Sequence, residues 1–295
     1  MKTRSARSRI EHLLFAVLLA FLGWIISLPG GAKKEWDPAP VLTVTVLDVG
    51  QGDSIFIQTP SGEQMLVDGG PDDAVLSKIG RLMPWNDRTI EMVVLTHPHA
   101  DHASGLVSVL ERYQVGKIIL ADVSYPSAIS EALQNEINRS RAAKEIVSGA
   151  TDFSFGGVDV HVLAPNHDFA GEHLANVHDA MVVLKLTYGT IDFLLTGDME
   201  AEGETALIDA GSDISAEVLK VGHHGSKTST TKEFLDAVHP EYTVISAGEK
   251  NRYHHPHPSV LLRLENFGAK ILRTDEIGDV RFTTNGSIID ATTSD

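Results

Sequence analysis

The sequence predicts an α/β protein with a polar site at the ends of its strands. Residues 90–95 and 191–195 are short apolar runs rich in β-branched side chains, a pattern typical of buried strands. Residues 126–141 and 259–267 carry apolar positions at helical spacing, as expected for helices that cover a sheet. Side chains able to bind a metal follow several of the strands directly. These three observations favour an α/β fold that supports a metal site.

The first 32 residues differ from the rest of the chain. An uncharged apolar run at residues 13–28 follows a basic segment that contains Lys2, Arg4, Arg7 and Arg9. This order is typical of an export signal, and the run is short for a membrane span, which needs about 20 apolar residues. We expect residues 1–32 to be either a cleaved signal peptide or an N-terminal membrane anchor. The rest of the protein would then be extracytoplasmic.

Composition limits the kinds of ligand and partner. The chain has no cysteine, so a metal site must use imidazole and carboxylate ligands. The net charge is −16, and residues 1–32 contribute four basic side chains against one acidic, so the remainder carries about −19. Such an acidic surface disfavours binding of an extended DNA duplex by a basic face. Part of this charge can also serve solubility alone.

From residue 41 onward the pattern is that of one domain, residues 41–295. Strands are expected at residues 43–47, 55–57, 65–67, 117–121, 145–147, 158–163, 181–187, 215–221 and 243–246, with a final edge strand at 278–282. Helices are expected at residues 74–83 and 100–110. Residues 50–52 read as a turn that lines the site, because no helix follows to make a phosphate loop. Asp48 and Asp68 read as structural, and Asp68 is the better candidate to hold a metal-bound histidine.

The densest group of candidate ligands follows the strand at residues 90–95. His97, His99, Asp101 and His102 lie within six residues. His97 and His99 alternate, so they share a direction, whereas Asp101 and His102 follow where the chain bends into a helix. Each buried imidazole needs a partner. The cluster therefore favours two metal ions over a surface turn with idle histidines.

Three later segments lead to the same edge. The hairpin formed by residues 181–187 and 191–195 brings His178 and Asp198 to one end, although His178 could instead be a surface histidine. The strand at residues 215–221 delivers His223 and His224. The proline-rich segment 251–258 would hold His255 over the expected metal site and offers Arg252 as a phosphate contact. For His254 and His257, a structural role is nearly as well supported as a role in the site.

These motifs resemble a known family. Five sequence motifs resemble those of the metallo-β-lactamase fold superfamily. They are HPHADH at residues 97–102, LDVGQGDS at 47–54, VDGG at 67–70, LTGD at 195–198 and KVGHHGS at 220–226. Within it, they are most similar to the soluble C-terminal domain of the ComEC family of DNA-uptake proteins. The resemblance extends from about Val41 to the C-terminus. It implies a metallo-β-lactamase αββα four-layer sandwich, in which two mixed β-sheets are flanked by helices.

The resemblance also implies roles for the candidate residues. One metal ion would take His97, His99 and His178, the other Asp101, His102 and His224, and Asp198 would bridge them. ComEC relatives often carry asparagine where His178 stands. His224 precedes a glycine, as the family ligand does, so His223 would face the substrate; the reverse assignment stays open. The two divalent ions would be zinc or manganese.

The implied mechanism uses a metal-bridging water that is deprotonated to hydroxide near neutral pH. His223 and His255 are candidate catalytic and substrate-binding residues that protonate the leaving group or stabilise developing charge. Arg252 is a further substrate-binding candidate. Asp101 also belongs to the catalytic set, although its position beside His102 favours a ligand over a general base.

We therefore expect an exported or membrane-anchored binuclear metallohydrolase, foremost a phosphodiesterase or nuclease of ComEC type that acts on phosphodiesters such as single-stranded DNA. The acidic surface favours small phosphodiesters such as phosphorylcholine esters as the runner-up, and β-lactamase activity is a weaker third reading. The alternative to an enzyme is a non-catalytic, membrane-associated component of a competence machine. The complete set of candidate metal ligands argues against it. With at most one span, the chain cannot itself be a DNA channel, and whether a separate membrane channel protein is its partner stays open.

Overall fold

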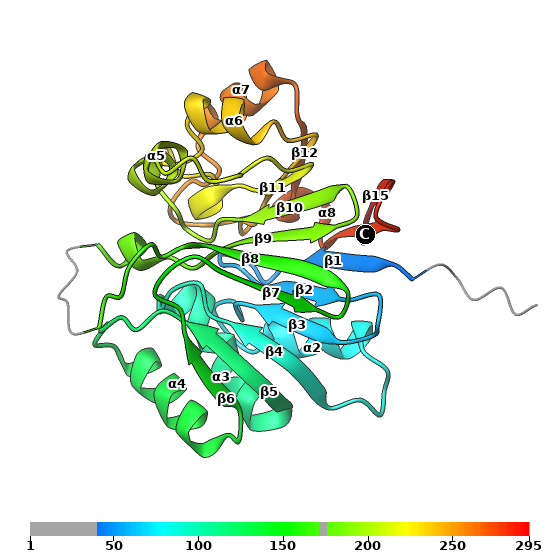
Figure 1. Cartoon of the computed structure of the whole chain (residues 1–295), viewed down its shortest axis with the longest axis vertical. Coiled ribbons are helices and arrows are strands. Elements are labelled where there is room, and N and C mark those ends of the chain that lie inside the picture. The colour runs from blue at the N-terminus through cyan, green and yellow to red at the C-terminus, as the bar shows by residue number, and fades with distance from the viewer. Residues whose placement is uncertain (1–39, 171–175, 295) are drawn as a thin grey trace, which may run out of the picture. The chain divides into compact units, whose positions relative to one another are not determined.

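Two mixed β-sheets form the centre of the part of the chain that the structure describes. A computed structural model describes residues 40–170 and 176–294, so the predicted leader at residues 1–32 lies outside the described residues. The sheets lie face to face, and helices flank them (Figure 1). Within the described ranges, no helix is long and apolar enough to cross a membrane.

The larger sheet has eight strands in the described residues, in the order β15-β14-β1-β2-β3-β4-β5-β6. Its strands are β1 (Leu42–Val46), β2 (Ile55–Gln58), β3 (Gln64–Val67), β4 (Thr89–Val94), β5 (Gln114–Leu120), β6 (Ala143–Ile146), β14 (Val280–Thr284) and β15 (Ile289–Thr293). Pairing is antiparallel from β15 to β3 and parallel from β3 to β6.

The second sheet has seven strands in the described residues, in the order β13-β12-β11-β10-β9-β8-β7. They are β7 (Thr151–Phe155), β8 (Val158–Ala164), β9 (Val183–Tyr188), β10 (Ile191–Leu195), β11 (Val218–Lys220), β12 (Tyr242–Ile245) and β13 (Lys270–Arg273). Strands β10 to β13 are parallel, and the others pair antiparallel. In each sheet the parallel strands share one carboxyl edge, where open α/β sheets place their ligands.

Helices cover the outer face of each sheet. The larger sheet carries α2 (Ala74–Leu82), α3 (Ala100–Arg112) and α4 (Ala128–Arg139), and the second carries α5 (Ala201–Asp209), α6 (Lys232–Val238) and α7 (Pro258–Phe267) (Figure 1). Shorter helical turns are α8 (Thr274–Ile277), η1 (Val177–Ala180) and η2 (Gly222–Gly225).

Strand alternation explains the layers. Along β1, Val44 and Val46 pack into the core between the sheets. The rings of Phe193 on β10 and Phe282 on β14 pack edge to face across that core, with their centres 5.9 Å apart. The opposite faces of the sheets pack on the helices, for example Leu66 on β3 in the cluster with α2 and α3. The predicted αββα sandwich is thereby confirmed.

One predicted strand role is wrong. The segment expected as the final edge strand is β14, which lies inside the larger sheet between β1 and β15. Its partner β15 is largely exposed, with the sequence IDATT, and so lacks the apolar run by which strands were recognised. Exposure also explains why β7 was missed, since its first four residues are partly or fully exposed. The prediction further omitted α5, α6, α8 and β13.

Candidate metal centre

The loop between β4 and α3 places the first ligands. His97 and His99 follow β4, His99 has extended backbone, and Ala100 begins the helix. The first turns of α3 lie against the glycine turn after β3: the amide of Gly69 donates to the carbonyl of His102 at 2.7 Å. A Cβ on Gly105 would come within 1.9 Å of the carbonyl oxygen of Gly69. Glycine at these two positions therefore lets the ligand-bearing helix approach the sheet.

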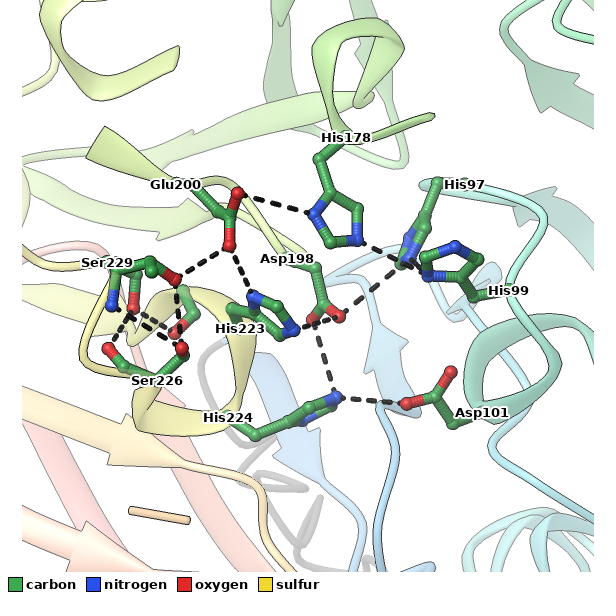
Figure 2. Close-up of polar contacts among 12 residues, drawn as sticks. His97, His99, Asp101, His178, Asp198, Glu200, His223, His224, Ser226 and Ser229 are labelled. Carbon is green, nitrogen blue, oxygen red and sulfur yellow. Dashed lines mark hydrogen bonds and ion pairs between the residues drawn. The ribbon is translucent and has the colours of Figure 1, made fainter. Parts of the chain in front are cut away.

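One cluster of ligand atoms contains His97, His99, His178 and Asp198, all within 4.8 Å of one another. Nδ1 of His99 lies 3.0 Å from Nε2 of His97 and 3.3 Å from Nε2 of His178. Oδ2 of Asp198 lies 3.8 Å from Nε2 of His97. Three ring nitrogens and one carboxylate oxygen thus point to one position (Figure 2).

A second cluster contains Asp101, His102, Asp198 and His224, again within 4.8 Å. Oδ1 of Asp198 lies 3.3 Å from Nε2 of His102 and 3.4 Å from Nε2 of His224. Oδ2 of Asp101 lies 3.3 Å from the same nitrogen of His224 (Figure 2). Asp198 therefore faces the first cluster with one oxygen and the second with the other.

The donor set fits divalent metal ions. Nε2 of His102, Nε2 of His224 and Oδ1 of Asp198 are buried and make no hydrogen bond within the described residues. Buried polar atoms are rarely left without partners, so three that converge indicate a cation-binding position. The Nδ1 atoms of the same two histidines, His102 and His224, face oxygen atoms of residues outside the cluster. Nδ1 of His102 lies 2.7 Å from Asp68, as predicted for that carboxylate, and Nδ1 of His224 lies 3.1 Å from the carbonyl oxygen of Ser246.

Electrostatics support the same interpretation. Burial lowers the pKa of His102, but the carboxylates of Asp198 and Asp68 outweigh burial and raise that pKa well above its usual value. Burial also opposes the charged form of His224, yet Asp198 and Asp53 raise its pKa to about 9. Burial and the neighbouring His102 hold the pKa of His97 well below its usual value, so this imidazole is neutral. Without metal, protons on His102 and His224 balance the carboxylates, and divalent ions would replace these protons.

The backbone separates His223 from His224. Both residues adopt left-handed conformations, with φ of 46° and 54°. His224 points into the second cluster, whereas His223 donates from Nδ1 to Oε1 of Glu200 at 3.1 Å (Figure 2). Nε2 of His223 lies 3.7 Å from Oδ2 of Asp198. Two adjacent histidines thus face different parts of the site.

A cleft of about 440 Å³ opens beside the clusters. Tyr125, Tyr253, Gln51, His223 and His255 line it together with ligand residues. Tyr125 and Tyr253 are 36% and 51% exposed, and the Tyr253 ring stacks on that of His255 with ring centres 5.8 Å apart. Burial and His223 lower the pKa of His255 to about 4, so its ring is neutral at neutral pH.

Arg252 lies at the rim, outside the residues that line the cleft. Its guanidinium sits 4.9 Å from the centre of the Tyr253 ring and donates to the Tyr253 hydroxyl at 2.7 Å. His254 is exposed, and His257 accepts from the amide of Ser259 at the start of α7. Asp48 accepts from the amide of Gly50 and belongs to neither cluster.

Sequence reasoning missed three polar residues that support the site. Glu200 follows Asp198 by two positions and contacts His223. Lys220 and Asp53 form a buried ion pair with Nζ and Oδ2 2.8 Å apart, and Oδ1 of Asp53 lies 3.3 Å from Nδ1 of His224. A lysine inside a predicted buried strand was the available signal, because such a charge needs a buried carboxylate.

An αββα sandwich that holds two clusters of histidine and aspartate side chains at one edge of its sheets is the arrangement of a metal-dependent hydrolase. The family model described as "Metallo-beta-lactamase superfamily" matches residues 47–249, about two thirds of the chain. This chain belongs to the metallo-β-lactamase superfamily.

Its relatives include competence proteins. The chain is 30% identical over 261 residues to ComE operon protein 3 of Bacillus subtilis, covering 81% of this chain and 32% of the relative. It is 32% identical over 266 residues to competence protein ComA of Neisseria gonorrhoeae, covering 88% and 35%. The chain therefore spans about a third of the length of these relatives.

A solved structure shows the same fold. The metallo-β-lactamase fold protein YhfI from Bacillus subtilis has a TM-score of 0.57 at 14% identity, covering 83% of this chain and 100% of that protein. At this identity the likeness concerns the fold alone.

Proposed function

We propose that this chain is a binuclear metal-dependent phosphodiesterase. The observation that carries the proposal is the sharing of Asp198 between two ligand clusters beside an open cleft. One ion would be held by His97, His99 and His178, and the other by Asp101, His102 and His224. When bound, two zinc or manganese ions supply Lewis acidity toward a phosphoryl oxygen and lower the pKa of water, the combination used by many phosphatases and nucleases.

The remaining polar side chains of the cleft suit substrate handling. His223 faces the cleft next to Asp198 and is placed to give a proton to the leaving oxygen. His255 is neutral and lies with its ring centre 5.7 Å from that of His223, so it serves as a hydrogen-bonding group for the substrate. Asp101 faces His224 at the cleft edge, and its contact favours a ligand role over that of a general base.

The rim favours a nucleotide-containing diester such as single-stranded DNA. Exposed Tyr125 offers a ring on which a base can stack, an interaction worth about 1–3 kcal/mol per base. Arg252 adds a positive charge for a neighbouring phosphate. The names of the relatives, which are competence proteins, agree with this substrate class.

A small phosphodiester such as a phosphorylcholine ester is the second candidate. The net charge of −16 favours it, since an acidic surface repels a long polyanion. Against it, the guanidinium of Arg252 already lies over the Tyr253 ring, where it would repel a quaternary ammonium group.

The cellular setting is part of the proposal. An export signal or anchor at residues 1–32 would place the enzyme outside the cytoplasm, with membrane association through that segment. A separate membrane channel protein is the partner proposed for DNA passage.

An activity screen tests this function. The purified chain, loaded with manganese or zinc, is assayed on bis(4-nitrophenyl) phosphate, single-stranded DNA and a choline phosphodiester, with Asp198→Asn as the inactive control. We expect cleavage of the first two substrates and a loss of at least about 10²-fold in the control. Absence of all three activities in a metal-loaded sample would support the non-catalytic alternative. Preference for the choline ester would select the second candidate.

A further inference from the structure

Glu200 stands between the first metal cluster and the proposed proton donor. It follows β10 by a short loop and is the N-cap residue of α5, two positions beyond Asp198. An N-cap side chain usually accepts a hydrogen bond from the first turn of its helix. Glu200 makes no such cap bond. Its carboxylate points instead toward two histidines (Figure 2).

One carboxylate oxygen of Glu200 holds His223. Oε1 accepts from Nδ1 of His223 at 3.1 Å and from the hydroxyl of Thr228 at 2.7 Å. Thr228 is itself within 2.9 Å of the hydroxyl of Ser226, so the carboxylate is anchored from the far side. With Nδ1 fixed, the opposite nitrogen of His223 is directed toward Asp198 and the cleft.

The other oxygen faces His178. Oε2 lies 3.8 Å from Nδ1 of His178 and accepts from the side-chain amide of Asn176 at 3.4 Å. The side chain of His178 is only 9% exposed, and its Nδ1 makes no hydrogen bond within the described residues. Nε2 of the same ring joins the first cluster. Glu200 is thus the nearest charged acceptor for the proton that a metal-binding His178 keeps on Nδ1.

We infer that Glu200 is a positioning residue that orients His178 toward the first metal and His223 toward the leaving group of the substrate. This inference rests on the proposed phosphodiesterase function. A carboxylate behind an imidazole fixes the tautomer and the ring orientation and stabilises the protonated ring, which is the arrangement that general acids use. Here the single carboxylate of Glu200 orients both the metal ligand His178 and the proton donor His223.

The test compares leaving groups. Glu200→Ala is measured with metal in excess on two diesters: one that releases nitrophenolate, which leaves without a proton, and a dinucleoside phosphate, which releases a sugar alkoxide that needs one. We expect kcat on the dinucleotide to fall about 10–100-fold, with a much smaller loss on the nitrophenyl diester. The control is Glu202→Ala, which removes an exposed glutamate from the same helix and should leave both rates unchanged. Glu200→Gln replaces Glu200→Ala if the alanine variant does not fold.

Two readouts do not depend on activity. In histidine-labelled ¹⁵N NMR of the metal-free protein, a hydrogen-bonded Nδ1 proton of His223 should be present in the wild type and in Glu202→Ala and absent in Glu200→Ala. Metal titration should show about 10–100-fold weaker binding at one of two sites in Glu200→Ala. Equal slowing of both diesters, with the His223 proton and both metal affinities unchanged, would overturn the inference. A wild type that cleaves neither diester would refute the phosphodiesterase proposal, while NMR and titration would still decide the role of Glu200.

Discussion

Lys220 and Asp53 form an ion pair between the two sheets, with Nζ 2.8 Å from Oδ2 and both side chains almost wholly buried. Lys220 ends β11 in one sheet, and Asp53 lies in the loop between β1 and β2 of the other. The second oxygen of Asp53 faces Nδ1 of His224 at 3.3 Å. The pair therefore joins the halves of the sandwich directly behind the second ligand cluster.

Removing the lysine should destabilise the fold strongly. Lys220→Met leaves the Asp53 carboxylate buried without its cation, a change that typically costs about 3–5 kcal/mol. Chemical denaturation of the metal-free protein measures the free energy of unfolding. The double variant Lys220→Met with Asp53→Asn should recover part of this loss, because it also removes the unpaired charge. A single variant as stable as the wild type would contradict this description of the pair.

Asp68 should control metal affinity without being a ligand. Its Oδ2 lies 2.7 Å from Nδ1 of His102 and also accepts from the hydroxyl of Thr96 at 2.6 Å. Asp68→Asn keeps the shape but removes the charge that supports His102 as a ligand. We expect metal binding weakened by about 10–100-fold, measured by calorimetric titration. Asp48→Asn is the matched control, since Asp48 contacts neither cluster, and it should bind metal as the wild type does.

His223 and His224 should separate metal binding from turnover. His224→Ala removes a member of the second cluster, so the protein should lose one metal ion together with activity. His223→Ala should keep both ions yet slow turnover by about 10²–10⁴-fold, the range for a general acid–base group. Metal content is measured beside the rate in each variant. If His223→Ala is the variant that loses metal, the two roles are reversed.

Acid stability should depend on Asp213. The ammonium group of Lys185 lies 2.8 Å from Asp213, and hydrogen bonds from Lys185 and Ser215 lower the pKa of Asp213 from 3.8 to about 2. A lowered pKa in the folded state adds stability above pH 3.8, which is lost as the pH falls toward 2. Asp213 is exposed, so the contribution is under about 1 kcal/mol.

Asp213→Asn should therefore destabilise the protein at neutral pH and match the wild type near pH 2, as followed by unfolding at a series of pH values. Asp290→Asn, at an exposed position on β15, controls for loss of a surface carboxylate. A destabilisation of Asp213→Asn that persists at pH 2 would show that the effect is not due to ionisation.

Much of the fold was predictable because most strands at the centre of the sheets are apolar runs. Residues 90–95 and 191–195 were recognised by this pattern and are β4 and β10. Strand β15 was missed and β14 misplaced at the edge, because an exposed strand carries no apolar run and order within a sheet depends on contacts far apart in sequence.

Most candidate ligands were predictable because they directly follow a strand or lie in a motif, and His178 was predictable because the hairpin after it leads back to Asp198. Their grouping into two clusters around Asp198 is a geometry that the structure shows, whereas metal binding by these residues stays a prediction. Glu200 and the pair of Asp53 with Lys220 could not be assigned partners from sequence. Asp53 and Lys220 are 167 positions apart, and only packing of one sheet against the other brings them together.

Metal stoichiometry tests the central claim most directly. The purified chain is saturated with manganese or zinc, freed of unbound ions and analysed by inductively coupled plasma mass spectrometry beside Asp198→Ala. We predict two ions per wild-type chain and fewer in the variant, because Asp198 belongs to both clusters. A wild type that holds no metal after loading, or an Asp198→Ala protein that holds both ions as tightly, would contradict it.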